Sequence, residues 1–200
     1  MSQPSSQPSK STRDQWPRLD QPRIAPVEKE SWSAAQKALL EPIAERGRLY
    51  NVHKTLANHP RLLGDWLSFA TYVLRDNSLG VRDREILILR IGYLCRAEYE
   101  LAQHARIGKR AGLTDDDLRR IAEGPAAAGL SEHERLLLQA VDELRANAFI
   151  GDATWNALAK TYNTQQMMDL VFTVGEYTMV SMALNSFGVP FDDDLEPYPE

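Results

Sequence analysis

The sequence predicts an all-α fold in a single domain, and three observations support that class. Apolar residues recur at helical spacing along most of the chain, and capping residues and glycines mark the expected helix ends. No segment carries a convincing strand pattern. The length of 200 residues suits one domain of ordinary size. We expect a helical bundle over residues 19–190, an extended or disordered arm over 1–18, and an acidic tail over 191–200.

The N-terminal part predicts a polar arm followed by two helices. Residues 1–18 are rich in Ser, Pro and Gln, a composition that favours disorder. Either Ser31 or Ser33 can cap a first helix over about 34–43. Apolar residues at helical spacing predict a second helix that begins near residue 60.

The central part predicts three further helices. The first runs over about 81–95 and the second over about 97–110, where Gly112 can supply the left-handed stop. Thr114, followed by three aspartates, caps a short helix that extends through Ile121.

The C-terminal part predicts three more helices, of which the last is unusually apolar. Ser131 opens a capping box with Glu134, and Asp152 is expected to cap the following helix. The last helix, over about 164–187, has almost no polar face. A helix that is apolar all round must be covered on all sides, so we expect a homo-oligomer.

Composition and charge exclude several classes of protein. The net charge is -5 and there is no basic stripe, which argues against nucleic-acid binding. The apolar runs are short and interrupted by charges, and the N-terminus lacks the apolar core of a signal peptide. The single cysteine, Cys95, cannot form an internal disulfide. We therefore expect no membrane contact and a cytoplasmic location.

The sequence gives no sign of a bound metal or cofactor. His53, His59 and His133 have no metal-ligand spacing with one another, and a glutamate and a histidine alone make a poor metal site. No Gly-rich phosphate loop is present. We expect a protein that works without a metal and without a cofactor on a small-molecule substrate.

The candidate site is a set of ionisable residues on the two central helices. Glu85 lies within the apolar run 84–90, where burial without a partner would cost several kcal/mol. Glu100 and His104 are four residues apart on the next helix and therefore share a face. A histidine can pair with the buried carboxylate and can exchange protons near neutral pH. The set predicts a proton-transfer site.

These residues also carry a family resemblance. The stretch over about 58–112 resembles the carboxymuconolactone decarboxylase family, which includes the alkylhydroperoxidase-D-like proteins. In the peroxidase branch the motif is Glu, eleven residues, Cys-x-x-Cys, three residues and His. Counting from Glu85 places Ala97 and Glu100 at the cysteine positions and His104 at the histidine position. Cys95 comes two positions too early, so the chain resembles the members that lack the thiol pair.

The resemblance implies an alkylhydroperoxidase-D-like helical bundle and roles for several residues. Glu85 and His104 would be the acid and base, in an order the sequence leaves open, and Glu100 would orient the imidazole. From the chemistry of the side chains themselves, Tyr99 can donate a hydrogen bond to a substrate oxygen and Arg90 can hold a substrate carboxylate. Family members are commonly trimers or hexamers, and the additional N-terminal arm leaves a dimer open as well.

Each of these residues also has a structural interpretation. Glu85 can pair with a neighbouring arginine, and His104 can be a hydrogen-bonded core or interface residue. Tyr99 can simply pack. Arg90 can form an ion pair with Glu85 or Glu98 instead of holding a substrate carboxylate.

Three functions remain open at this stage. The first is a cofactor-free lyase or isomerase that acts on a small carbonyl or lactone acid, for example from the breakdown of aromatic compounds. The second is an alkylhydroperoxidase-like peroxidase, which needs a nucleophilic and a resolving thiol that the motif positions lack. The third is a non-catalytic oligomer that has kept the fold.

Overall fold

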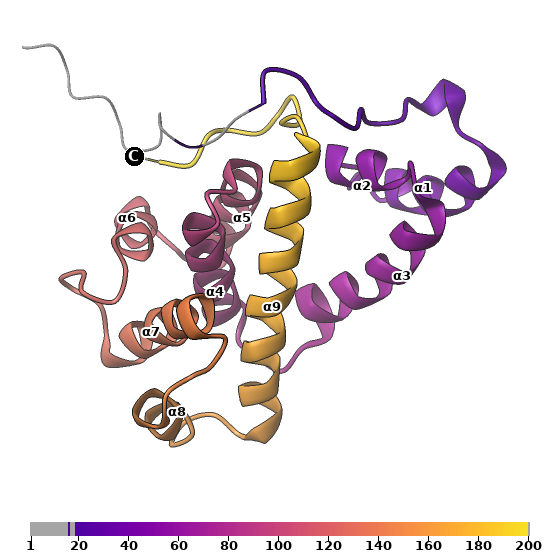
Figure 1. Ribbon diagram of the computed structural model, residues 1–200. Helices are drawn as coiled ribbons and strands as arrows, with labels where there is room; N and C mark the ends of the chain where they lie inside the picture. The colour runs from indigo at the N-terminus through magenta and orange to yellow at the C-terminus, as the bar shows by residue number, and fades with distance from the viewer. Residues whose placement is uncertain (1–15, 17–18, 200) are drawn as a thin grey trace, which may run out of the picture.

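The computed structural model describes residue 16 and residues 19–199 of the chain. Within that part the structure consists of helices and connecting segments without strands, which confirms the predicted all-α class (Figure 1). Most of the predicted arm over 1–18 lies outside the described residues. Of the described helices, none is both long and apolar enough to cross a membrane.

The helices follow one another with short connections, except for the longer linker before α7. Two short non-α segments also occur, a 3₁₀ turn at Lys29–Ser31 and a π-helical turn at Tyr72–Asp76. The α-helices are α1 (Ala34–Glu45), α2 (Asn51–Leu56), α3 (Pro60–Thr71), α4 (Val81–Leu94), α5 (Glu98–Arg110), α6 (Asp115–Glu123), α7 (Glu132–Asn147), α8 (Asp152–Leu158) and α9 (Thr164–Phe187).

Local sequence signals account for most helix ends. Ser33, Thr114 and Ser131 each form a capping box with the residue three positions later, so Ser33 rather than Ser31 begins α1. The cap of α8 is Gly151, and the expected cap Asp152 is instead its first residue, where a carboxylate favours the positive end of the helix dipole. The six-residue α2 was not predicted, because so short a helix shows no clear periodicity.

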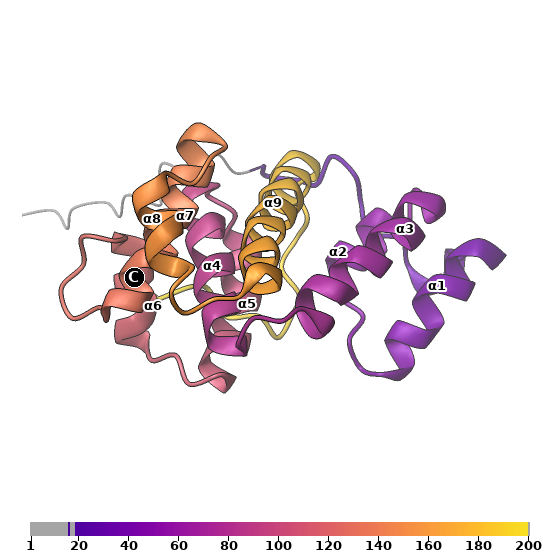
Figure 2. The same cartoon turned by 90° about the horizontal axis from the view of Figure 1, so that it is seen from below.

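Helix α4 lies at the centre of the core. Its residues from Arg84 to Gly92 are all buried, and α4 contacts α5, α6, α7 and α9 (Figure 2). A helix surrounded in this way needs apolar residues on every face, which explains the continuous run Ile86–Leu89. The charged residues at the two ends of this run must find partners inside the protein.

Helix α9 lies between the two halves of the structure. One flank meets α4 and α5, and the other faces α2 and α3 (Figures 1 and 2). A single chain does not cover the whole helix. Four of its apolar side chains are between 51% and 58% exposed: Met168, Phe172, Met179 and Met182. They recur at intervals of three, four or seven residues and form one outward stripe, called here the α9 stripe.

The C-terminal tail packs against the helices. Leu195 and Tyr198 are buried, and the Tyr198 hydroxyl donates a hydrogen bond of 2.5 Å to the carbonyl of Leu118. Asp192 accepts hydrogen bonds from the backbone N–H of Asn51 at 2.7 Å and from the Tyr99 hydroxyl at 2.6 Å. The tail therefore connects α2, α5 and α6.

Candidate acid–base site

The two central helices bring the three predicted acid–base residues into one linear set. Glu85 projects from α4, while Glu100 and His104 lie one turn apart on α5. The His104 Nδ1 atom lies 2.6 Å from Oε2 of Glu85, and its Nε2 atom lies 3.0 Å from Oε1 of Glu100. The imidazole is therefore held between two carboxylates; we call these three residues the Glu–His–Glu set.

Neighbouring side chains hold Glu85 and His104 in place. The Arg84 guanidinium donates from Nε and Nη2 to Glu85 Oε1, at 3.2 and 3.0 Å. The ring of Tyr177, on α9, meets the His104 ring edge-on with 4.9 Å between centroids. The contact restricts how far the imidazole can turn. Helices α4, α5 and α9 thus all contribute to the site.

Burial and charge together determine the protonation of His104. Only 4% of His104 is exposed, and this burial alone would lower the imidazole pKa. The charge of Glu85 and the hydrogen bond to Glu100 outweigh that effect and raise the pKa of His104 from 6.5 to about 10. His104 is therefore an imidazolium at neutral pH, with both N–H groups donated to carboxylates.

A third buried glutamate borders the set and was missed by the sequence analysis. Glu176, on α9, is 3% exposed; its Oε1 atom accepts a 2.7 Å hydrogen bond from the Trp66 indole N–H. Its Oε2 atom is buried and has no hydrogen-bond partner. Burial and the nearby charge of Glu100 raise the pKa of Glu176. The hydrogen bond from Trp66 lowers this pKa, but the net shift is upward.

The sum of the charges around Glu176 accounts for the direction of this pKa shift. Arg84 and His104 carry two positive charges, and Glu85 and Glu100 carry two negative ones, so the cluster is balanced without it. An ionised Glu176 would add an uncompensated buried charge, which costs several kcal/mol. Burial and these charges therefore favour the protonated form of Glu176 more than in an exposed glutamate. The sequence did contain a signal for Glu176, because it is a carboxylate in the middle of the most apolar helix. The same type of signal, a glutamate within an apolar run, identified Glu85.

The two predicted substrate residues make contacts elsewhere. Arg90 donates to both carboxylate oxygens of Asp142, at 2.6 and 2.8 Å, and to the carbonyls of Ile121 and Ala122. The sequence offered Glu85 or Glu98 as ion-pair partners, and the structure pairs Arg90 with Asp142 instead. These contacts fasten α4 to the end of α6 and to α7.

Tyr99 faces the tail rather than the imidazole. Its hydroxyl donates to Asp192 at 2.6 Å and lies 3.4 Å from the backbone N–H of Val52 and from the Gln103 amide. Its ring belongs to a small apolar cluster with Val180 and Leu184. These contacts give Tyr99 a structural role beside the site.

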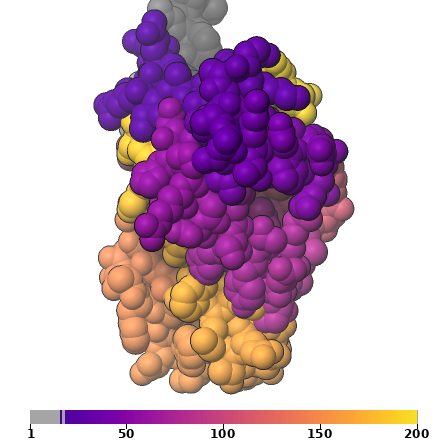
Figure 3. All heavy atoms as spheres, turned by 90° about the vertical axis from the view of Figure 1, so that its right-hand side faces the viewer, coloured from indigo at the N-terminus to yellow at the C-terminus, as the bar shows by residue number. Residues whose placement is uncertain are grey.

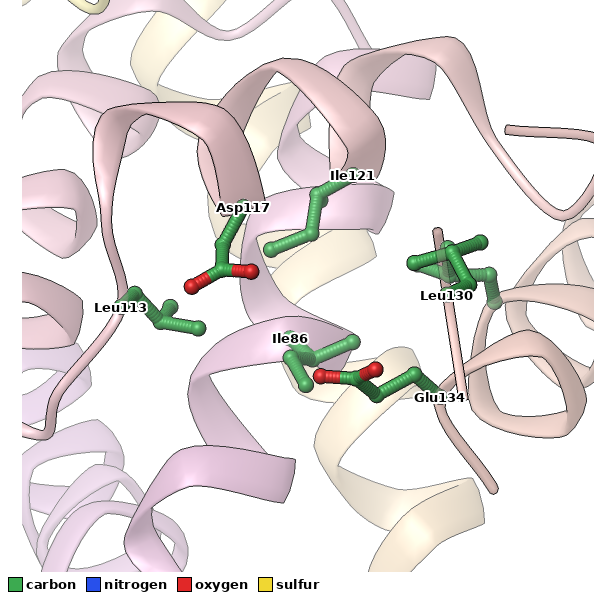
Figure 4. Close-up of a pocket in the computed structure, with 7 residues that line it drawn as sticks. Ile86, Leu113, Asp117, Ile121, Leu130 and Glu134 are labelled. Carbon is green, nitrogen blue, oxygen red and sulfur yellow. The ribbon is translucent and has the colours of Figure 1, made fainter. Parts of the chain in front are cut away.

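Among the residues that the structure describes, a small cavity and a groove adjoin the core, and their linings do not include the Glu–His–Glu set. The first lies among α4, α6 and α7, around Ile86, Asp117 and Glu134, and its volume of about 10 Å³ holds about one water molecule (Figure 4). The second is a groove of about 110 Å³ between α2, α3 and the C-terminal half of α9, called here the α3–α9 groove. Its lining is entirely apolar and includes Val52, Leu56, Trp66, Val180, Leu184 and Phe187.

Comparison with known proteins agrees with this architecture. Residues 60–143 match the model of the carboxymuconolactone decarboxylase family. This part of the chain is therefore similar to that family. The match runs from the start of α3 into α7, so it includes the Glu–His–Glu set, whereas Tyr177 and Glu176 lie beyond it. A search of curated proteins by sequence gives no significant match.

Solved structures share the fold at low sequence identity. An uncharacterized peroxidase-related protein from Ralstonia eutropha JMP134, with an alkylhydroperoxidase AhpD core, has a TM-score of 0.74 at 17% identity, over 86% of this chain and 93% of its own. A peroxidase-related protein from Silicibacter sp. TM1040 gives 0.68 at 19%, over 88% and 92%. The debrominase Bmp8, in complex with 2,3,4-tribromopyrrole, gives 0.68 at 12%, over 85% and 91%. These similarities show an AhpD-like fold.

The lone thiol is the clearest departure of this chain from the peroxidase motif. Cys95 follows α4 and is partly buried, and that burial raises its pKa, although contacts with Arg145 and Ser181 lower it in part. A raised pKa is the opposite of what a nucleophilic thiolate needs. Among the described residues there is no cluster of three His, Cys, Asp or Glu side chains suited to a metal.

Proposed function

We propose that the protein is a cofactor-free acid–base enzyme of the carboxymuconolactone decarboxylase family, acting as a lyase or isomerase on a small carbonyl compound. The observation that carries this proposal is the position of His104 between Glu85 and Glu100. Two buried carboxylates on one imidazolium form a proton-transfer system, and the neighbouring arginine and tyrosine hold it in place. The chain contains a single cysteine and so cannot form an internal disulfide. We therefore expect the protein to act in the reducing cytoplasm.

The contacts favour Glu100 as the group that meets the substrate. Both His104 nitrogens are already occupied, and Glu85 is fully buried against Arg84. Of the two carboxylates Glu100 is the less buried, with 6% of its side chain exposed against 0% for Glu85. We therefore assign proton transfer to Glu100 and a positioning role to His104 and Glu85. The sequence analysis had given Glu100 the orienting role.

The assignment fits chemistry at a carbon next to a carbonyl. The Glu100 carboxylate takes a proton from that carbon, and the electron pair of the broken C–H bond forms an enolate. The same carboxyl group then returns the proton to another carbon of the enolate, which completes an isomerisation. In a decarboxylation the C–C bond to the leaving carboxylate supplies the enolate electrons, and Glu100 delivers a solvent-derived proton. Such a positioned acid or base contributes about 10²–10⁴-fold.

A thiol peroxidase is less well supported. It would need a second thiol and a stabilised thiolate, and the chain holds one cysteine whose pKa is raised by burial. Debromination is the activity of Bmp8 and is not transferred to this chain at 12% identity.

The test of the proposed function is to offer the purified protein carboxymuconolactone and, separately, a hydroperoxide with a dithiol. We expect turnover of the lactone or a related carbonyl compound, at least 10²-fold slower for Glu100→Gln. Dithiol-dependent hydroperoxide turnover, or no turnover at all, would contradict the proposal.

We also propose that the protein is a homo-oligomer that buries the α9 stripe. Met168, Phe172, Met179 and Met182 are more than half exposed on one side of a 24-residue helix, and an apolar patch of this kind favours an interface. Figure 3 shows the side of the molecule on which α1–α3 lie above and the orange segment, around α8 and the start of α9, lies below. Light scattering should give a multiple of 22.6 kDa, and Phe172→Asp should lower it to a single chain.

A further inference from the structure

The exposed residues of α9 follow the spacing of a coiled coil. From Gln165 onwards they are separated alternately by three and four residues, a period of 3.5 that keeps one seam of a helix facing a second helix. The structure describes α9 in full, and none of its exposed residues carries a charge. The seam consists of Gln165, Met168, Phe172, Gly175, Met179, Met182 and Ser186.

Gly175 lies at the centre of this seam. Glycine in the interior of a helix is destabilising relative to alanine. Among the described residues, a Cβ atom at Gly175 would meet nothing within 4 Å, and its φ is not positive. Neither packing nor backbone conformation within one chain therefore requires glycine here. A small residue in a helix interface does let the backbone of a second helix approach closely.

The α9 stripe is nearly symmetric about Gly175. Met168 and Met182 each lie seven residues from it, and Phe172 and Met179 lie three and four residues from it. An antiparallel α9 of a second copy, crossing at Gly175, would place Met168 opposite Met182 and Phe172 opposite Met179. In such an isologous contact each copy presents the same surface, so both stripes are covered at once.

The same arrangement directs an aromatic ring to the α3–α9 groove. Phe172 lies on the α3 flank of α9, where its ring meets that of Phe69 with 6.2 Å between centroids. The groove lies on this flank too, along Met179 and the following residues of α9. A two-fold axis across the antiparallel pair keeps both α3 flanks on one side, so Phe172 of the second copy points toward the groove. The groove volume of about 110 Å³ is comparable to a cavity of roughly 150 Å³ that accepts one benzene ring.

The exposed apolar surface reaches the size of a specific interface. Two further side chains extend the stripe: Leu62 lines the groove with Met179, and Tyr72 stacks on Phe69 next to Phe172. These two and the four stripe residues are each 42–58% exposed. At about 200 Å² for a large side chain, they expose about 600 Å² per copy and about 1,200 Å² in a pair. Stable interfaces begin at about 1,200 Å², before the filled groove is counted.

We propose that two copies of this chain associate through antiparallel α9 helices that cross at Gly175, and that each α3–α9 groove receives the Phe172 ring of the other copy. The proposal rests on the self-association proposed above and specifies its geometry. Because the contact contains a two-fold axis, the assembly is a dimer or is built from such dimers, and it is not a trimer.

Gly175→Leu tests the crossing point. Within one chain the added side chain meets open space, so the helix content and thermal unfolding of the variant should show a folded protein. In the pair two leucines hold the helices apart, and sedimentation equilibrium should show association weakened about 100-fold or more. Lys37→Leu adds the same side chain at an exposed position of α1 and should associate as wild type does. Unweakened association of Gly175→Leu would overturn the proposal.

A double-mutant cycle tests the groove. Ala183→Phe fills the groove from its own chain, and Phe172→Ala removes the ring that is proposed to enter it. Each variant should weaken association about 10-fold, but in the Ala183→Phe background Phe172→Ala should add little, because the ring has already been displaced. Fully additive losses would show that Phe172 and the groove do not meet.

Cross-linking tests the antiparallel direction. Cys95→Ser gives a background without thiols, into which Met168→Cys and Met182→Cys are introduced separately. A short bifunctional maleimide should join the two variants only after they are mixed. In an antiparallel pair equal positions lie roughly 20 Å apart along the helix, so neither variant should be cross-linked alone. Cross-links within one variant, or none in the mixture, would overturn the proposal.

The outcomes separate this arrangement from the proposals on which it depends. A wild-type protein that stays a single chain would overturn both the self-association and this geometry. A trimer, or an oligomer that tolerates Gly175→Leu, would keep the self-association and overturn the geometry alone. Turnover of a carbonyl compound is measured separately and tests the acid–base function whatever the mass.

Discussion

Two histidines of this fold pair with carboxylates at the start of α4, and they differ in what surrounds them. His104 meets Glu85 in the core, and a second carboxylate holds its other nitrogen. His133 meets Asp83 two positions earlier on α4, at 2.9 Å, with 34% of its side chain exposed. The Tyr162 hydroxyl completes that second cluster by donating to Asp83 at 2.5 Å.

The difference shows how the same pair of residue types serves two purposes. Around His133 solvent screens the charges, so the contact contributes modestly and connects the ends of α4 and α7. Around His104 burial strengthens every electrostatic interaction and the two carboxylates raise the imidazole pKa. In the proposed function an imidazolium held in this way positions the Glu100 carboxylate, while the exposed pair has a structural role.

The largest expected effect is on turnover. His104→Ala should lower the turnover of the carbonyl substrate by about 10²–10⁴-fold, because it removes the group that holds the carboxylates in place. His133→Ala is the matched control and should remain within about 2-fold of wild type, since no step of the proposed chemistry involves it. Steady-state kinetics on both variants checks the comparison, and an equal loss in the two would remove the distinction between the clusters.

The next effect is on folding stability. Glu85→Ala leaves the buried charge of Arg84 unpaired and leaves His104 with Glu100 as its one remaining carboxylate, so it should lower the free energy of unfolding by about 3–5 kcal/mol. Asp83→Ala removes hydrogen bonds in a partly exposed cluster and should cost about 1 kcal/mol. Urea denaturation of the two variants measures the difference. A smaller loss for Glu85→Ala than for Asp83→Ala would contradict our account of burial.

The third effect is the dependence of stability on pH. The pKa of His104 is about 10 in the folded state and 6.5 when unperturbed, so the folded state binds this proton more tightly. The resulting stabilisation is fully present below about pH 6.5 and is lost as the pH rises toward 10. Unfolding experiments across this window should show a decline for wild type and for His133→Ala, and a clearly weaker one for His104→Gln. Parallel curves for all three proteins would contradict the assignment.

The smallest expected effect is at the single thiol. Cys95→Ser should leave most of the turnover intact and change stability by no more than about 1 kcal/mol, since the partly buried thiol has no thiol partner in the chain. The measurement is turnover and thermal unfolding of this variant beside wild type. A Cys95→Ser protein inert toward every substrate would favour one-cysteine redox chemistry instead.

The sequence predicted the parts of the fold that depend on local signals. Capping boxes and periodicity located most of the helices, and the fixed spacing from Glu85 to His104 identified the pair that the structure brings to 2.6 Å. An i,i+4 pair such as Glu100 and His104 is a property of one helix, so the sequence contains it directly.

Contacts between distant segments could not be predicted in the same way. Arg90 and Asp142 are 52 residues apart, and their pairing depends on how α4 and α7 pack. Gly124 approaches the same arginine so closely that a Cβ atom there would lie 2.5 Å from Nη2. The position of Glu176 beside Glu100 likewise depends on the packing of α9, which no local pattern determines.

The protonation of His104 tests the central claim most directly. The two ring nitrogens can be observed in ¹⁵N-labelled protein through their couplings to the ring protons, with His104→Gln used to assign them. At pH 8 the account predicts that both nitrogens of His104 carry protons, because Glu85 and Glu100 each accept one N–H. A neutral ring at pH 8, with one unprotonated nitrogen, would contradict it.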